Sequence, residues 1–210
     1  MSPPAASVAS HRRSSVRRRT ARRRGVLWLA GGVALAVLVA VLVAPLFQKA
    51  IRELTLPLQH ADIIRQQATE KHLDPALIAG VIYAETKFDA RTSPAGALGL
   101  MQIEPQTAEF LAHRSGATSF TIGDLGTPQV NIAYGSYYLR YLIDHYGGNV
   151  TLALAAYNAG QTNVDRWVST RGQGMTVDQI PFSETRAYVS RVLWAQSQYR
   201  HAYAGQLGYG

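Results

Sequence analysis

The sequence contains no cysteine, which excludes disulfide bonds, a cysteine-linked lipid anchor and thiol chemistry. It has no internal repeat, and apolar and polar residues alternate over no more than a few positions, which argues against a repeat array and an extended β-sheet. Acidic residues are missing from the first 24 positions. A chain of 210 residues with these absences is long enough for one globular domain that needs no covalent staples, plus accessory segments.

The net charge of +8 belongs to an N-terminal tail, residues 1–24, which holds eight arginines. Without these eight, the 21 basic residues fall to 13, which matches the 13 acidic ones, so the rest of the chain is formally neutral. The tail is interpreted as a topology determinant in the cytoplasm that also contacts anionic lipid. Nucleic-acid binding is the alternative reading of the tail, and the charge distribution argues against it for the domain.

Residues 25–44 form a run of twenty residues without a charge or a strongly polar group. As a helix this run would be about 30 Å long, the thickness of a bilayer's hydrocarbon core. The sequence therefore predicts a transmembrane signal anchor that places the following domain outside the cell membrane, facing the cell wall. A cleavable signal peptide is the alternative, but Pro45 follows the best cleavage site, after Ala44, and disfavours cleavage. Residues 45–57 are expected to be a short juxtamembrane linker.

From residue 58 onward helical patterns dominate, separated by loops rich in Gly, Pro, Ser and Thr. The expected fold is mainly α, a compact bundle of about six to seven helices with at most a small β-element in 88–104. Residues 201–210 are expected to be a flexible tail. Helices are predicted near 58–72, 75–87, 105–114, 129–146, 150–158, 161–169 and 183–200.

The helix that begins at Asp74 carries an unexpected carboxylate. Asp74 is a good N-cap and Pro75 suits the first helical position. The following apolar residues recur at three- and four-residue spacing, and the same stripe continues to Glu85. Burial would raise the pKa of a carboxyl group and make it a general acid at neutral pH. Alternatively, the last turn of the helix simply reaches the surface and Glu85 is solvated.

Three further segments carry polar side chains near glycines or helix ends. "SPAGALGLMQIEP" (93–105) offers the Gln102 amide beside two turn-forming glycines, "ALAAYNAG" (153–160) ends a helix with Tyr157 and Asn158, and "ETRAYV" (184–189) places Glu184 and Tyr188 on one helix face. Each segment alone is better explained as ordinary core, cap or solvated helix.

In this order and spacing, the four segments resemble the soluble lytic transglycosylase family, relatives of goose-type lysozyme. That family reads Glu-Ser, Gly-Leu-Met-Gln, Ala-Tyr-Asn-Ala-Gly and Glu-Thr-x-x-Tyr-Val, and the resemblance covers roughly residues 58–200. Thr86 stands where the family usually has Ser. The resemblance implies an α+β lysozyme-like fold and cleavage of the β-1,4 bond between N-acetylmuramic acid and N-acetylglucosamine in peptidoglycan glycan strands, without a metal or cofactor.

By the same resemblance, Glu85 is the catalytic acid and then the base, and the muramic 6-hydroxyl replaces water, leaving a 1,6-anhydro end. Residues implied to bind substrate or line its cleft are Thr86, Met101, Gln102, Tyr157, Asn158, Glu184 and Tyr188. Two alternatives remain open: a lysozyme-like muramidase that hydrolyses the same bond, and an inactive peptidoglycan-binding module.

Overall fold

The computed structural model describes residues 37, 39–44, 47, 51 and 53–209, and the chain divides into two units, Met1–Leu54 and Thr55–Gly210. In the first unit the described residues are helical and exposed. Among the residues that the structure describes, no helix is both long and apolar enough to cross a membrane. The predicted tail and most of the predicted anchor and linker lie outside the described residues.

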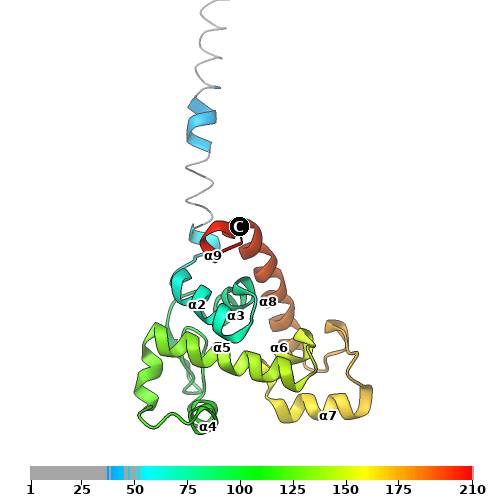
Figure 1. Ribbon diagram of the computed structural model, residues 1–210. Coiled ribbons are helices and arrows are strands. Elements are labelled where there is room, and N and C mark those ends of the chain that lie inside the picture. The colour runs from blue at the N-terminus through cyan, green and yellow to red at the C-terminus, as the bar shows by residue number, and fades with distance from the viewer. Residues whose placement is uncertain (1–36, 38, 45–46, 48–50, 52, 210) are drawn as a thin grey trace, which may run out of the picture. The chain divides into compact units, whose positions relative to one another are not determined.

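The second unit is mainly helical, as expected from the sequence (Figure 1). The seven predicted helices are confirmed, with ends that shift by at most a few residues. The α-helices are α2 (Ala61–Lys71), α3 (Pro75–Thr86), α4 (Pro105–Ser115), α5 (Pro128–His145), α6 (Val150–Ala159), α7 (Gln161–Arg171), α8 (Ser183–Ala202) and α9 (Ala204–Leu207). The shorter elements are strands β1 (Arg91–Thr92) and β2 (Leu98–Gly99) and the 3-10 helices η1 (Ile122–Gly126) and η2 (Val177–Gln179).

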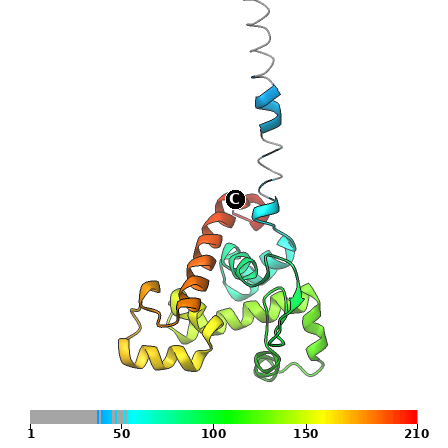
Figure 2. The ribbon, with the colours of Figure 1, turned by 180° about the vertical axis from the view of Figure 1, so that it is seen from behind.

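Helix α3 is the centre of the domain, with α2, α5 and α8 arranged around it (Figures 1 and 2). The sequence predicted one buried stripe, but every residue from Ala76 to Ile82 is buried, so α3 is enclosed on all sides. It packs most closely against α8 at Gly80. A Cβ atom on Gly80 would lie 2.9 Å from the carbonyl oxygen of Val192, so only glycine permits this helix spacing.

The N-terminus of α3 is fixed by Asp74, as predicted. Its side chain accepts a hydrogen bond from the backbone N–H of Ala76 at 2.9 Å. The same carboxylate also accepts from Gln196 at 2.6 Å, from Arg200 and from the hydroxyl of Tyr209. Asp74 therefore ties the start of α3 to the C-terminal end of the domain.

Residues 201–209 are not the loose tail that the sequence suggested. Helix α8 continues to Ala202, α9 follows, and the side chain of Leu207 is buried. The hydroxyls of Tyr199 and Tyr203 donate to the carbonyls of Pro57 at 2.5 Å and Leu56 at 2.7 Å. Periodicity could not reveal this packing, because it joins the two ends of the domain.

The small β-element predicted in 88–104 is confirmed as an antiparallel pair of two-residue strands, β1 and β2. Buried Asn131 on α5 holds the segment in place. Its amide donates to the carbonyls of Leu98 at 2.8 Å and Leu125 at 3.0 Å, and its oxygen accepts from the backbone N–H of Met101 at 2.8 Å. Gly99, at φ 75°, approaches Asn131 so closely that any Cβ there would collide with the amide.

Candidate active site

Glu85 lies in the last turn of α3, where the enclosed helix reaches a cavity. Its carboxyl group is largely surrounded by protein, and this burial raises its pKa from 4.5 to about 7. A hydrogen-bonding contact with Tyr188 and the charges of Arg191 and Arg91 oppose the rise without cancelling it. Desolvation therefore favours the protonated form of Glu85, so that a fraction of the group carries a proton near neutral pH.

Two tyrosines lie close enough to Glu85 to interact with it electrostatically, Tyr157 on α6 and Tyr188 on α8. Burial raises the pKa of both hydroxyls, and the charge of Glu85 raises it further, so both stay neutral donors. The Tyr157 hydroxyl donates to the carbonyl of Met101 at 2.9 Å. The buried Tyr188 hydroxyl makes no other hydrogen bond, so its contact is with the adjacent Glu85 carboxyl.

A cavity of about 560 Å³ opens in front of Glu85, within the usual size range of small-molecule sites. Its walls come from α3, the β1–β2 segment, α4, α5, the α6–α7 turn and the start of α8. The lining residues are Glu85, Ser93, Ala95, Ala97, Gln102, Ile103, Glu104, Thr107, Tyr138, Tyr157, Asn158, Ala159, Gly160 and Glu184. All four sequence segments therefore meet at one place.

Four residues predicted to bind substrate line this cavity: Gln102, Tyr157, Asn158 and Glu184. The amide nitrogen of Gln102 is engaged with the carbonyls of Arg91 at 2.7 Å and Gly99 at 2.8 Å, which leaves its oxygen as an acceptor. The oxygen of Asn158 accepts from the Thr185 hydroxyl at 2.8 Å, which leaves its nitrogen as a donor. The two amides thus offer complementary hydrogen-bonding groups.

Thr86, Met101 and Tyr188 do not line the cavity; they are buried behind it. The Thr86 hydroxyl donates to the carbonyls of Ile82 at 3.2 Å and Leu100 at 2.8 Å and so joins α3 to the loop after β2. The Met101 side chain packs against Gly135 of α5, where a Cβ atom would lie 2.3 Å from its sulfur. Both residues support the walls rather than forming an apolar surface for a ligand.

Four polar cavity residues were not singled out from the sequence: Ser93, Glu104, Thr107 and Tyr138. Glu104 adds a carboxylate besides Glu85 and Glu184. It directly follows the "GLMQI" stretch, and this position next to a motif could have marked it as a site residue. Burial raises the pKa of Tyr138 to about 12. The centroids of the Tyr138 and Tyr157 rings are 5.3 Å apart. Tyr138 had no sequence signal, because only the packing of α5 against α6 brings the two rings together.

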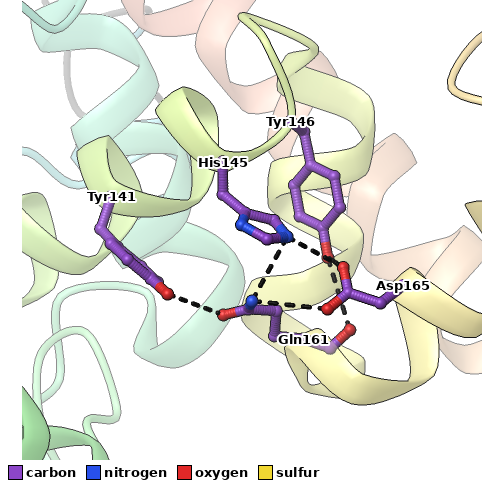
Figure 3. Close-up of polar contacts among 5 residues, drawn as sticks. All are labelled: Tyr141, His145, Tyr146, Gln161 and Asp165. Carbon is purple, nitrogen blue, oxygen red and sulfur yellow. Dashed lines mark hydrogen bonds and ion pairs between the residues drawn. The ribbon is translucent and has the colours of Figure 1, made fainter.

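A polar cluster holds the start of α7 (Figure 3), next to the cavity residue Gly160. Asp165 accepts hydrogen bonds from Tyr146 at 3.0 Å and Gln161 at 3.4 Å, and it pairs with His145 at 3.0 Å. Gln161 follows Gly160 directly, so these contacts hold a cavity residue in place through its neighbour. Over the part of the chain that the structure describes, no group of three or more His, Cys, Asp or Glu could hold a metal ion.

The family described as "Transglycosylase SLT domain" matches residues 62–179, more than half of the chain. The chain belongs to this family. Among the SLT relatives, the soluble lytic murein transglycosylase of Salmonella typhimurium is 34% identical over 151 residues, which are 69% of this chain and 23% of that protein. The "Membrane-bound lytic murein transglycosylase C" of Actinobacillus pleuropneumoniae is 28% identical over 168 residues, 68% of this chain and 46% of that protein.

Solved structures agree with the family assignment. The 70-kDa soluble lytic transglycosylase of Escherichia coli superposes with a TM-score of 0.68 at 32% identity, covering 75% of this chain and 26% of that one. An inactive mutant of the lytic transglycosylase Slt from Pseudomonas aeruginosa superposes with a TM-score of 0.66 at 30% identity, covering 72% of this chain and 25% of that one. The SLT domain described here thus spans about a quarter of these soluble relatives.

Proposed function

We propose that the domain is a peptidoglycan lytic transglycosylase that cleaves the β-1,4 bond between N-acetylmuramic acid and N-acetylglucosamine. The observation that carries the proposal is the carboxyl group of Glu85, whose pKa desolvation raises to about 7 at the wall of a cavity. Family membership and the lytic transglycosylase names of the relatives support it.

In the proposed reaction Glu85 donates its proton to the glycosidic oxygen while the bond from that oxygen to the anomeric carbon breaks. The muramic 6-hydroxyl then attacks the anomeric carbon, and the Glu85 carboxylate accepts the hydroxyl proton. The proton count balances, no water is consumed, and the product carries a 1,6-anhydro ring. A pKa near 7 suits both steps, because the group must lose and regain a proton at similar cost.

The other site residues are proposed to hold the sugar rings. Gln102 would accept hydrogen bonds from the sugar hydroxyls or acetamido groups, and Asn158 would donate hydrogen bonds to them. The Tyr157 ring and Glu184 would form walls of the cavity around the sugar. Tyr188 is proposed to hydrogen-bond the ionised form of Glu85 after the first proton transfer.

We further propose that residues 25–44 anchor the protein in the cell membrane, with the arginine tail in the cytoplasm and the domain facing the wall. The uncharged run, the preceding arginines and the name of the membrane-bound relative support this arrangement. Carbonate-washed membranes should retain the full-length protein, and its intact mass should include residues 1–44. A mature protein that begins after Ala44 would contradict the anchor and leave the enzyme proposal unaffected.

Mass spectrometry of digested peptidoglycan tests the reaction. A 1,6-anhydro end is lighter than a reducing end by one water, and only a reducing end reacts with borohydride. We expect anhydro ends from the wild-type protein and roughly 10³- to 10⁴-fold fewer from Glu85→Gln. Reducing ends alone would establish the lysozyme-like hydrolase, whereas binding without any product would establish the binding module.

A further inference from the structure

A row of aromatic side chains leaves the cavity along α5. Tyr138 lines the cavity, and Tyr141 and His145 follow it at three and seven residues, on the same face of the helix. The rings of Tyr138 and Tyr141 are parallel within 13° at 6.3 Å between centroids, and Tyr141 and His145 are also 6.3 Å apart. From Tyr138 to His145 the helix advances about 10 Å.

Helix α4 supplies a second row that faces the first. Thr107 lines the cavity, and Phe110 and Arg114 continue outward on the same helix face. Phe110 meets the Tyr141 ring edge-on at 5.4 Å, and the Arg114 guanidinium lies 4.9 Å from the centre of that ring. Although it packs on Tyr141, Phe110 is 43% exposed, which is unusual for a phenylalanine.

The outer end of the α5 row is fixed by the cluster in Figure 3. The Tyr141 hydroxyl donates to Gln161 at 3.2 Å, and Gln161 contacts His145 and Asp165 at 3.3 and 3.4 Å. Tyr141 is therefore held from both sides, by Phe110 and Arg114 of α4 and by Gln161 of α7. A rigid, part-exposed ring surface flanked by planar polar groups is suited to binding sugar rings, which present apolar faces and hydroxyl edges.

We infer that Phe110, Arg114, Tyr141 and His145, here called the α4–α5 ledge, bind sugar residues of the glycan strand beyond the bond that is cut. The inference rests on the proposed function and extends it to a preference for long strands. The ledge continues directly from cavity residues Thr107 and Tyr138. Because a glycan polymer held at Glu85 would extend beyond the cavity, the same strand is the ligand that reaches the ledge.

Binding measurements with strands of increasing length test the ledge. The full 210-residue chain carrying Glu85→Gln would be titrated with size-sorted, peptide-free glycan strands, since it binds without cutting. We expect affinity to rise with strand length until the ledge is filled. Adding Phe110→Ala should weaken binding of long strands about 2- to 10-fold, the range for one aromatic contact, and leave the shortest strands unaffected.

Two control variants separate stacking from general damage. Trp194→Ala removes another part-exposed aromatic, 51% exposed on α8 and packed on Tyr83 at 5.8 Å, and should change binding at no length. Tyr141→Phe keeps the ring but loses the bond to Gln161, so it should weaken long-strand binding less than Phe110→Ala.

The ledge would be overturned if adding Phe110→Ala left the affinity unchanged, or lowered it by the same factor for strands of every length. An effect seen only with peptide-bearing strands would assign the surface to the stem peptide instead, and would also overturn it. Neither result bears on the anhydro product, which is measured with the wild-type protein, so the two proposals can fail separately.

Discussion

The two ends of α3 carry carboxylates in opposite environments. Asp74 at the N-terminus accepts hydrogen bonds from a backbone N–H, an amide, a guanidinium and a hydroxyl. Glu85 at the C-terminal end lines the cavity but is largely surrounded by protein, with a hydrogen-bonding contact to Tyr188, and desolvation raises its pKa to about 7. The same chemical group thus fixes a helix end where it is hydrogen-bonded, and is favoured in its protonated form where it is desolvated.

The largest effect is expected from Glu85→Gln, which removes the proton donor and keeps the side chain's shape. Cleavage of purified peptidoglycan should fall roughly 10³- to 10⁴-fold, the range for losing general acid–base catalysis. Turbidity loss of a cell-wall suspension measures the rate. An unchanged circular dichroism spectrum would show that the fold is intact, and retained lysis would refute the role of Glu85.

The same variant should change how stability depends on pH. Between pH 4.5 and about 7 the unfolded chain releases the Glu85 proton while the folded protein keeps it, so rising pH lowers the free energy of unfolding. The loss should approach about 3.5 kcal/mol, on the order of 1.4 kcal/mol for each unit of pKa difference, and level off above pH 7. Urea unfolding should show that the free energy of unfolding of Glu85→Gln increases relative to that of the wild type at pH 8 but not at pH 4.5. An equal difference at both values would contradict the raised pKa.

Asp74→Ala should instead lower stability and leave the chemistry alone. Loss of the helix cap and of the bonds to Arg200 and Gln196 should reduce the free energy of unfolding by about 2 kcal/mol. Asp144→Ala is the matched control, because its pair with Arg140 is 69% exposed on the Asp side and should matter by less than about 0.5 kcal/mol. The activity of folded Asp74→Ala should equal that of wild type, and an activity loss without destabilisation would contradict this division.

The smallest effect is expected from Tyr188→Phe. The Tyr188 contact lowers the pKa of Glu85, so its removal should move the alkaline limb of the activity profile upward by less than about one pH unit. Tyr157→Phe, whose hydroxyl is bonded to the Met101 carbonyl instead, should not move this limb. Rates measured between pH 5 and 9 would separate the two tyrosines, and a downward shift in Tyr188→Phe would contradict the assignment.

Helix positions could be predicted from the sequence because they depend on local residue order, whereas the proposed role of Glu85 came only from its combination with three distant segments. Asp74 followed by Pro75 marked the start of α3, and Glu85 stood out against an apolar pattern. The supporting residues could not be predicted, since Asn131, Tyr138 and Leu207 act through contacts across the fold. Thr86 and Met101 were found through their motifs, yet their orientation away from the cavity depends on how α3 and α5 enclose the loop after β2.

Helix α8 acts as a spacer within the domain. Its first turn brings Glu184 to the cavity, and Tyr203, directly after its last turn, holds the carbonyl of Leu56, where the chain enters the domain. Twenty residues of helix separate these points by about 30 Å. The cavity and the point where the chain enters the domain therefore lie at opposite ends of α8.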